Sequence, residues 1–224
     1  MRQMMLSESE SWSGPRLTER DLDALRWLVE QRAASLDQVG RLLHQLTGGD
    51  VVTDRRVRQV VARWAQLGLV TKWNVWHGEP AVVIPTGRAA QMFGQMRWRR
   101  PGIGILRHTV AVSEVRLRMA PIGGPRRWVS ESELRRIIQP GEHLADGGSI
   151  EDGLGVAVEV ELTPHGRKRV ETTIKSLLYA HDGNGLRWAK VLYLCSPSTI
   201  AQVTAVVSAL PPAERSRVIV RPMP

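Results

Sequence analysis

The segment of residues 53–68 has two contrasting faces, and it limits what the first half of this chain can fold into. At 100° per residue its apolar side chains fall on one side of a helix, and these are Val57, Val60, Val61, Trp64 and Leu67. The opposite side consists of arginine and glutamine, namely Arg55, Arg58, Gln59, Arg63 and Gln66, with Arg56 at its border. Thr53 or Asp54 supplies an N-cap, and Gly68 ends the segment. The pattern predicts a helix that packs on a core by one face and presents an acid-free basic face.

That basic face indicates an anionic partner. A solvated helix usually mixes charges, because opposite charges four residues apart form stabilising pairs. An arginine and glutamine face without acids is better explained by phosphate contacts and by reading of base edges in a major groove of DNA. The alternative is a basic face that is merely solvated.

The neighbouring segments predict a small domain around this helix. One helix begins after the N-cap Thr18 and a second after the N-cap Ser35, each with apolar residues at helical spacing. Two short strands, 71–76 and 81–84, follow the third helix as a hairpin, and a further helix begins near Pro85. Three helices followed by a hairpin is the order of a winged helix-turn-helix, expected over residues 16–96. Trp73 and Trp76 on the hairpin either contact the DNA backbone or cover the open side of the core.

The flanking segments and the composition set further expectations. Residues 1–15 are polar and lack the apolar region of a signal peptide, so we expect a flexible tail and a cytoplasmic location. No stretch is apolar enough to predict a membrane span or a membrane partner. The net charge of +9 favours a polyanionic partner. Residues 97–105 form a basic linker that either clamps phosphates or is an ordinary connection with Trp98 packed between domains.

Residues 106–224 predict a second domain of the α/β type with a mixed sheet. The expected helices cover residues 106–119, 131–138, 164–181 and 199–210, and the expected strands cover 127–129, 155–162, 189–195 and 217–220. Ser130 and Glu133 form a capping box for the helix that begins at Glu131. Because Cys195 is the only cysteine, a disulfide within the chain is excluded, and Cys195 is predicted to be a core residue.

The strand 155–162 carries the candidate chemistry of this domain. Its period of two puts Glu159 and Glu161 on one face, and two adjacent carboxylates on an apolar strand need a compensating cation. Mg²⁺ would supply it if Asp146 joined them from a neighbouring strand. The alternative is that both glutamates pair with basic residues of the following helix, namely Arg167, Arg169 or Lys175.

Several short motifs together resemble the replication-relaxation family of plasmid and mobile-element proteins across nearly the whole chain. These motifs are Leu17-Thr-Glu-Arg-Asp, Gly68-Leu-Val, Pro85-Thr-Gly-Arg, Leu106-Arg-His-Thr-Val-Ala-Val-Ser-Glu-Val, Ala145-Asp-Gly and Glu159-Val-Glu-Leu-Thr. The resemblance implies a role in plasmid replication or DNA relaxation, and a second domain similar to the PD-(D/E)xK nucleases. The predicted fold class is therefore α+β, with the winged helix-turn-helix followed by a restriction-endonuclease-like domain.

The resemblance also implies site residues. Asp146 and Glu159 match the two acidic, metal-binding positions of the nuclease pattern, whereas Ala145 replaces the usual proline and Glu161 replaces the lysine that positions or activates water. Lys168 or Lys175 could take the place of that lysine, and Glu161 could itself be a metal ligand or a base. His108 and His143 are expected to be structural or hydrogen-bonding residues.

Three functions follow from these patterns. The leading hypothesis is a DNA-binding accessory or regulatory factor in the replication, transfer or transcription of a bacterial mobile element. The rival is a Mg²⁺-dependent DNA endonuclease or nickase targeted by its winged helix, and the third is an adaptor that binds itself or a replication, transfer or transcription protein. The expected partner is double-stranded DNA, contacted by Arg55, Arg56, Arg58, Gln59, Arg63, Lys72, Arg97, Arg99 and Arg100.

Overall fold

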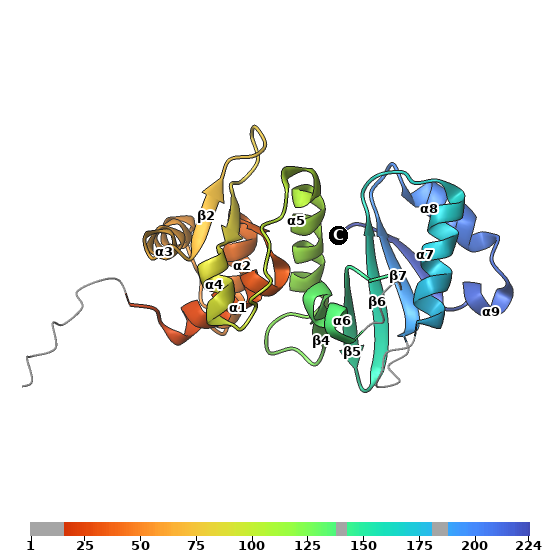
Figure 1. The fold of residues 1–224 in the computed structure, drawn as a ribbon, viewed down its shortest axis with the longest axis horizontal. Coiled ribbons are helices and arrows are strands. Elements are labelled where there is room, and N and C mark those ends of the chain that lie inside the picture. Colours follow the sequence, from red (N-terminus) through yellow and green to blue (C-terminus); the bar gives the residue numbers. More distant parts are fainter. Residues whose placement is uncertain (1–15, 138–142, 181–187) are drawn as a thin grey trace, which may run out of the picture.

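The computed structural model describes residues 16–137, 143–180 and 188–224, which form two groups of helices and strands on either side of one long helix, α5 (Ile103–Met119) (Figure 1). The tail predicted for residues 1–15 and the predicted helix ends at residues 138 and 181 lie outside this description. The structure is a mixed α+β fold. No helix in the described part of the chain is both long and apolar enough to cross a membrane.

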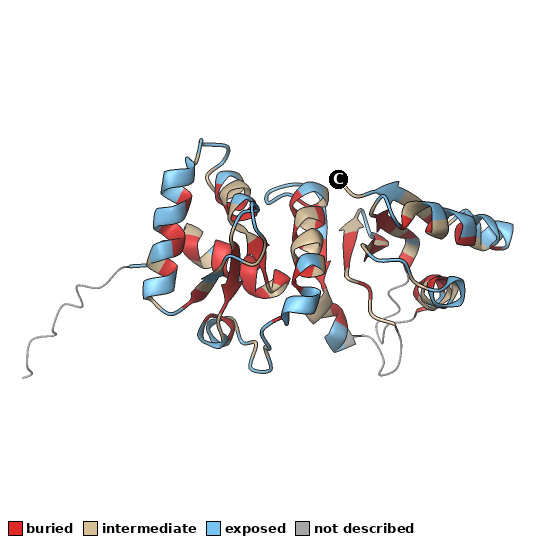
Figure 2. Ribbon diagram, turned by 90° about the horizontal axis from the view of Figure 1, so that it is seen from above, coloured by how far each residue is buried: buried red, intermediate tan, exposed pale blue. Residues whose placement is uncertain are grey.

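The first group consists of the elements that precede α5 in the sequence. Its three predicted helices are confirmed, and their caps explain where they begin. They are α1 (Glu19–Gln31), α2 (Leu36–Leu46) and α3 (Asp54–Gln66). Thr18 and Ser35 each form a capping box with the residue three positions later, and the Thr53 side chain accepts a hydrogen bond from the Arg56 amide. Buried residues line the inward side of α3 and exposed residues its outward side, as the helix at the far left of Figure 2 shows.

A small antiparallel sheet completes the first group. The hairpin strands β2 (Val70–Trp73) and β3 (Val82–Pro85) are offset from the predicted ones by up to three residues, and α4 (Gly87–Met92) follows them. The two-residue strand β1 (Ala34–Ser35) pairs with β3, which gives the order β1-β3-β2. Sequence periodicity did not reveal β1, because two residues are too short to show an alternation.

Helix α5 belongs to both groups. It begins three residues earlier than predicted, at Ile103, because Gly102 takes the N-cap position in an extended conformation. Leu106 and Leu117 pack into apolar clusters of the first group, whereas Val115 packs against the sheet of the second group. The buried Ser113 hydroxyl donates a hydrogen bond of 2.6 Å to the carbonyl oxygen of Ala33. The predicted boundary between linker and second domain therefore falls inside a helix that both halves share.

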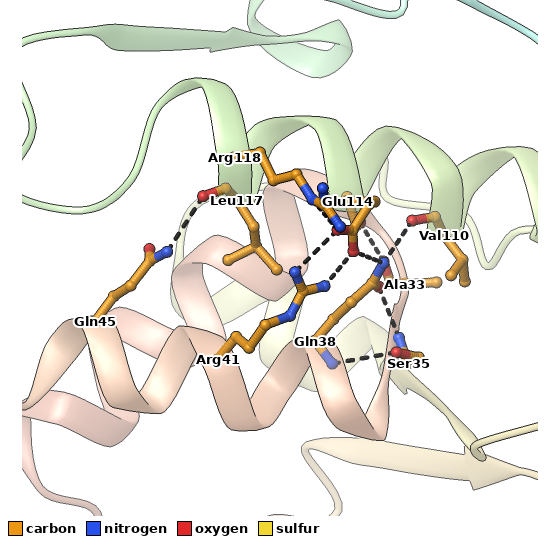
Figure 3. Close-up of polar contacts among 10 residues, drawn as sticks. Ala33, Ser35, Gln38, Arg41, Gln45, Val110, Glu114, Leu117 and Arg118 are labelled. Carbon is orange, nitrogen blue, oxygen red and sulfur yellow. Dashed lines mark hydrogen bonds and ion pairs between the residues drawn. The ribbon is translucent and has the colours of Figure 1, made fainter. Parts of the chain in front are cut away.

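A polar junction fixes α5 to α2 (Figure 3). The Glu114 carboxylate accepts hydrogen bonds from both terminal nitrogens of Arg41, one of them at 2.9 Å, and from Arg118 Nε at 2.6 Å. Gln38 Nε2 donates to the Glu114 carboxylate at 3.1 Å and to the Val110 carbonyl oxygen at 2.9 Å. Although burial opposes ionisation, these bonds lower the pKa of Glu114 to about 2. The junction therefore remains an ion pair at neutral pH.

Replacing Glu114 by alanine is expected to lower the free energy of unfolding by about 1 to 2 kcal/mol at neutral pH, because Arg41 and Gln38 lose their common acceptor. The contribution of Glu114 is present above its ordinary pKa and is lost as pH falls toward 2. Urea denaturation followed by tryptophan fluorescence measures it. Glu19→Ala, at an exposed position of α1, is the control; equal stability of the two variants would contradict the role of the junction.

The second group is built on a five-stranded mixed sheet of order β4-β5-β6-β7-β8. The strands are β4 (Arg127–Ser130), β5 (Gly147–Glu151), β6 (Leu154–Glu161), β7 (Trp188–Cys195) and β8 (Val218–Pro222). The pairs β4–β5 and β5–β6 are antiparallel, and the pairs β6–β7 and β7–β8 are parallel. The predicted mixed sheet is confirmed.

Helices cover both faces of this sheet. The helices α7 (Arg167–Tyr179) and α8 (Ile200–Ser208) pack on one face and α5 packs on the other (Figure 1). Two short helices, α6 (Glu131–Ile137) and α9 (Pro212–Arg215), lie between strands in the sequence. On β6, Val158 and Val160 pack in the cluster with α5, and Ala157 packs in the cluster with α7. The predicted alternation of this strand is therefore confirmed.

Strand β5 was not predicted, because it begins with two glycines, which are depleted in strands. The structure shows why glycine stands there. A Cβ atom on Gly147 would lie 2.2 Å from the Trp128 ring, and one on Gly148 would lie 2.3 Å from the Trp188 ring. The two tryptophan rings fill the space that side chains of β5 would otherwise occupy.

Candidate functional site

Two places in the structure gather the residues that the sequence singled out: the exposed face of α3 and a pocket beside β6. On α3, Arg55, Arg56, Arg58 and Gln59 are all exposed. None of the ion pairs formed within residues 16–137, 143–180 and 188–224 involves these three arginines. The one acid of the helix, Asp54, is its first residue, where the helix dipole favours a negative charge. The exposed face beyond it is basic.

Arg63 departs from the predicted set. Its Nη2 lies 2.5 Å from Oδ2 of Asp21, a carboxylate of α1 with no exposed surface. The neighbouring Trp64 Nε1 donates to the other oxygen of Asp21 at 3.1 Å. Arg63 thus lies at the edge of the core and neutralises a buried acid, unlike the exposed arginines of α3.

The basic residues of the hairpin and linker have mixed surroundings. Lys72 on β2 is exposed, and so are Arg97 and Arg99. The guanidinium of Arg100 lies 3.3 Å from the centre of the Trp73 ring, which is partly buried in an apolar cluster with Ala33 and Leu106. Trp76 and Trp98 are partly buried against the same cluster. The tryptophans therefore cover the core, as one of the two alternatives for Trp73 and Trp76 predicted.

The pocket lies toward the carboxyl end of β6 and has a volume of about 610 Å³. Its acidic residues are Asp146, which immediately precedes β5, and Glu159 and Glu161 of β6. The structure therefore brings together the three acids that the sequence singled out. Its histidines are His108 of α5, His143 and His165.

Each carboxylate of the pocket is paired with an imidazole. Asp146 Oδ1 lies 2.8 Å from His108 Nε2, and Asp146 Oδ2 accepts a hydrogen bond of 2.8 Å from the backbone amide of Val160. Glu159 Oε1 lies 3.1 Å from His143 Nε2. In the third pair, Glu161 Oε1 lies 3.5 Å from His165 Nε2. The direct partners of Glu159 and Glu161 among the described residues are therefore histidines, whereas Arg169 lines the same pocket without forming an ion pair with either glutamate.

Burial and mutual repulsion shift the protonation of this cluster. Burial first, and then the charge of Asp146, raises the pKa of Glu159 to about 7. The hydrogen bond to Glu159 raises the pKa of His143. Burial opposes the protonation of His108, but the hydrogen bond to Asp146 and the nearby carboxylates outweigh it and raise the pKa of His108. The cluster therefore holds protons near neutral pH more tightly than its separate groups would.

The lysines expected to complete a nuclease site are not in the pocket. Lys168 is exposed, and Lys175 pairs with Glu171 on α7 at 2.7 Å. Neither lines the pocket as the described residues form it, whereas Arg169 does. Neither Lys168 nor Lys175 therefore lies among the described residues that line the pocket, where it could replace the missing lysine.

The acids are also not arranged to hold a metal ion. Among the described residues, no group of three or more histidine, cysteine, aspartate or glutamate side chains has a metal-binding arrangement. Both oxygens of Asp146 have hydrogen-bond partners, and Glu159 and Glu161 face imidazoles. The predicted Mg²⁺ set of Asp146, Glu159 and Glu161 therefore shares a pocket but does not fit the ion in this arrangement.

Two residues of the pocket, His165 and Tyr193, were not predicted as site residues. The apolar pattern around Tyr193 indicates only a strand. Tyr193 is opposite Glu159 in the parallel pair β6–β7, and its buried hydroxyl has no hydrogen-bond partner among the described residues. The spacing of His165 four residues after Glu161, past the end of a strand, was the one available signal.

Comparisons with known proteins give little similarity. No family model matches the chain, and no curated protein matches it. The crystal structure of protein VC1899 from Vibrio cholerae aligns over 92% of this chain and 54% of that protein, with 12% sequence identity and a TM-score of 0.30. The chain thus spans about half the length of that protein. A likeness this low transfers neither fold nor function.

Proposed function

We propose that this protein binds double-stranded DNA through α3, the recognition helix of an N-terminal winged helix-turn-helix. The observation that carries the proposal is the exposed face of Arg55, Arg56, Arg58 and Gln59, which has no acidic partner in the described structure. Guanidinium and amide groups in this arrangement suit phosphate contacts and the acceptor edges of guanine and adenine. The opposite face of the helix is buried, so its orientation is fixed by the core.

The order of elements supports the winged-helix assignment. Helix α2 packs on α3, and the hairpin β2–β3 follows α3 directly. In helix-turn-helix proteins the second helix of such a pair enters the major groove and the preceding one crosses the backbone. The exposed Lys72 on β2 would then contact phosphate from the wing.

The biological process is proposed from the resemblance of motifs alone. On that basis the protein is an accessory or regulatory factor in the replication, transfer or transcription of a bacterial mobile element, and it acts in the cytoplasm. The second group of elements is proposed to be the nuclease-like domain of that resemblance, supported by its mixed sheet and by the position of Asp146 and Glu159 in one pocket.

We do not extend the proposal to metal-dependent cleavage of DNA. Among the described residues no lysine lines the pocket in the water-positioning role of the nuclease pattern, and imidazoles lie against its carboxylates. A site of this composition is better suited to holding protons than to holding Mg²⁺.

Replacing Arg55 or Arg58 by alanine is expected to weaken DNA binding about tenfold to a hundredfold for a base contact. For a phosphate contact the loss is smaller, and the slope of log K against log salt becomes shallower by about one. The measurement is fluorescence anisotropy with a short labelled duplex, selected by the wild-type protein from a random library, over a series of salt concentrations.

Arg221→Ala is the matched control, because it removes the same charge from an exposed position on β8, far from α3 in the fold. Its affinity should stay within about twofold of the wild type. If Arg55→Ala and Arg58→Ala bind as tightly as Arg221→Ala, with unchanged salt slopes, α3 is not the recognition helix.

A further inference from the structure

A second basic surface lies away from α3, in a cleft of about 640 Å³ between the linker and α6. Five arginines and one acid line it, namely Arg32, Arg97, Arg99, Arg135, Arg136 and Glu131. They come from three separate segments: the end of α1, the linker, and α6. Only the arginines of the linker are adjacent in the sequence, and the other arginines reach the cleft through the tertiary fold.

The charges of this cleft are not balanced from within. Glu131 is shared, since it lies 3.7 Å from Arg32 and also pairs with Arg135. Arg97 and Arg136 are exposed and take part in none of the ion pairs seen in the described parts of the chain. One carboxylate among five guanidinium groups leaves a strong positive potential, which a concave surface concentrates.

Two local features indicate that the cleft is more than a solvated basic surface. Arg32 follows α1 in a left-handed backbone conformation, with φ of 70°, where glycine is the usual residue. Its side chain donates a hydrogen bond of 3.3 Å to the carbonyl oxygen of Arg99, which holds it against the linker. Trp98 also lines the cleft, and its buried indole N–H has no acceptor among the described residues. A buried donor without a partner is costly.

We propose that this cleft is a phosphate-binding site, separate from α3, that takes the phosphate groups of a nucleotide or of a DNA backbone. The planar guanidinium fork matches two phosphate oxygens at once, and several forks around one cleft suit a ligand with more than one phosphate. The volume is within the range of sites for small ligands. A ligand held by Arg97 and Arg136 would bridge the linker and α6, and so join the two groups of elements.

The test uses the double variant Arg97→Gln/Arg136→Gln, because neither side chain forms an ion pair with another described residue that the substitution would break. The comparison protein is Arg55→Gln/Arg58→Gln, which removes the same charge from α3. Thermal denaturation establishes that both variants are folded. Isothermal titration then measures the binding of ATP and, as a ligand without phosphate, adenosine; fluorescence anisotropy measures a labelled duplex over a salt series.

Two results support the site and identify the source of its phosphate. If the wild type and the α3 variant bind ATP but not adenosine, and the cleft variant binds ATP at least about tenfold more weakly, the ligand is a nucleotide. The second result is that ATP does not bind, and that the slope of log K against log salt for DNA binding is shallower by about two in the cleft variant than in the wild type. The ligand is then the DNA backbone.

The proposal is overturned if the cleft variant equals the wild type for both ligands. The α3 variant reports separately on recognition by α3: its DNA binding can fail or persist without altering the comparison between the cleft variant and the wild type.

Discussion

Replacing Asp21 by alanine is expected to lower the free energy of unfolding by about 3 to 5 kcal/mol. The carboxylate is fully buried and accepts hydrogen bonds from the Thr18 amide and hydroxyl, from Arg63 and from Trp64 Nε1. Burial raises the pKa of Asp21, but the bonds from Thr18 and Arg63 outweigh it and leave the pKa below its ordinary value. Asp21 is therefore ionised at neutral pH, and its removal leaves a partly buried guanidinium and a buried indole N–H without an acceptor.

Urea denaturation at neutral pH measures this loss, and Asp23→Ala, at an exposed position of the same helix, is the control. The double variant Asp21→Ala/Arg63→Leu separates charge from packing, because it removes both members of the ion pair. It should be more stable than Asp21→Ala alone. If Asp21→Ala lowered the free energy of unfolding by less than about 1 kcal/mol, the buried carboxylate would not stabilise the fold as argued from its hydrogen bonds.

The second large effect is a loss of stability with rising pH that depends on Glu159. A folded-state pKa of about 7 lies above the ordinary pKa of glutamate, so the folded protein binds this proton more tightly than the unfolded chain does. The stability gained from it is complete below the unfolded pKa and is lost as pH rises through about 7. His108 and His143, whose pKa values are also raised, lose their contribution in the same direction, above the ordinary pKa of histidine. We expect the free energy of unfolding to fall by roughly 3 kcal/mol from about pH 5 to about pH 8.

Urea denaturation across that pH interval checks the expectation with the wild type, Glu159→Gln and Glu19→Gln. Glu159→Gln carries no titrating carboxyl at this position, so its stability should depend less on pH, whereas the exposed Glu19→Gln should follow the wild type. Asp21 and Glu114, whose pKa values are lowered, titrate below this pH interval. They therefore do not contribute to the change of stability within it. Equal pH slopes for all three proteins would show that Glu159 is ionised throughout.

The first group of elements was predictable because its signals are local. The N-caps Thr18, Ser35 and Thr53 and the apolar spacing of each helix depend only on residues a few positions apart. The alternation of β6 was equally readable, since neighbouring residues of a strand face opposite ways. The alternation of β6 also placed Glu159 and Glu161 on one face as candidate site residues, whereas Asp146 was matched to a site position through the motif Ala145-Asp-Gly of the family resemblance.

What the sequence did not show depends on contacts between distant segments. A helical wheel places Arg63 with the solvent-facing arginines and contains no information about Asp21, which lies 42 positions earlier. The pairing of His108 with Asp146 joins residues 38 positions apart, and it requires that α5 pack beside the sheet. Strand β5 was hidden because its glycines are dictated by the rings of Trp128 and Trp188.

The shared helix α5 determines where the protein can be divided. Leu106 and Leu117 fill the cores of the first group, so a fragment that ends at residue 96 would expose apolar surface and lose the Glu114 junction. A fragment that begins at residue 106 would carry that surface on a helix without its partners. The smallest fragment around α1, α2 and α3 that keeps its own core therefore extends to about residue 120, and any recombination that transferred this fragment to another protein would have to carry α5 with it.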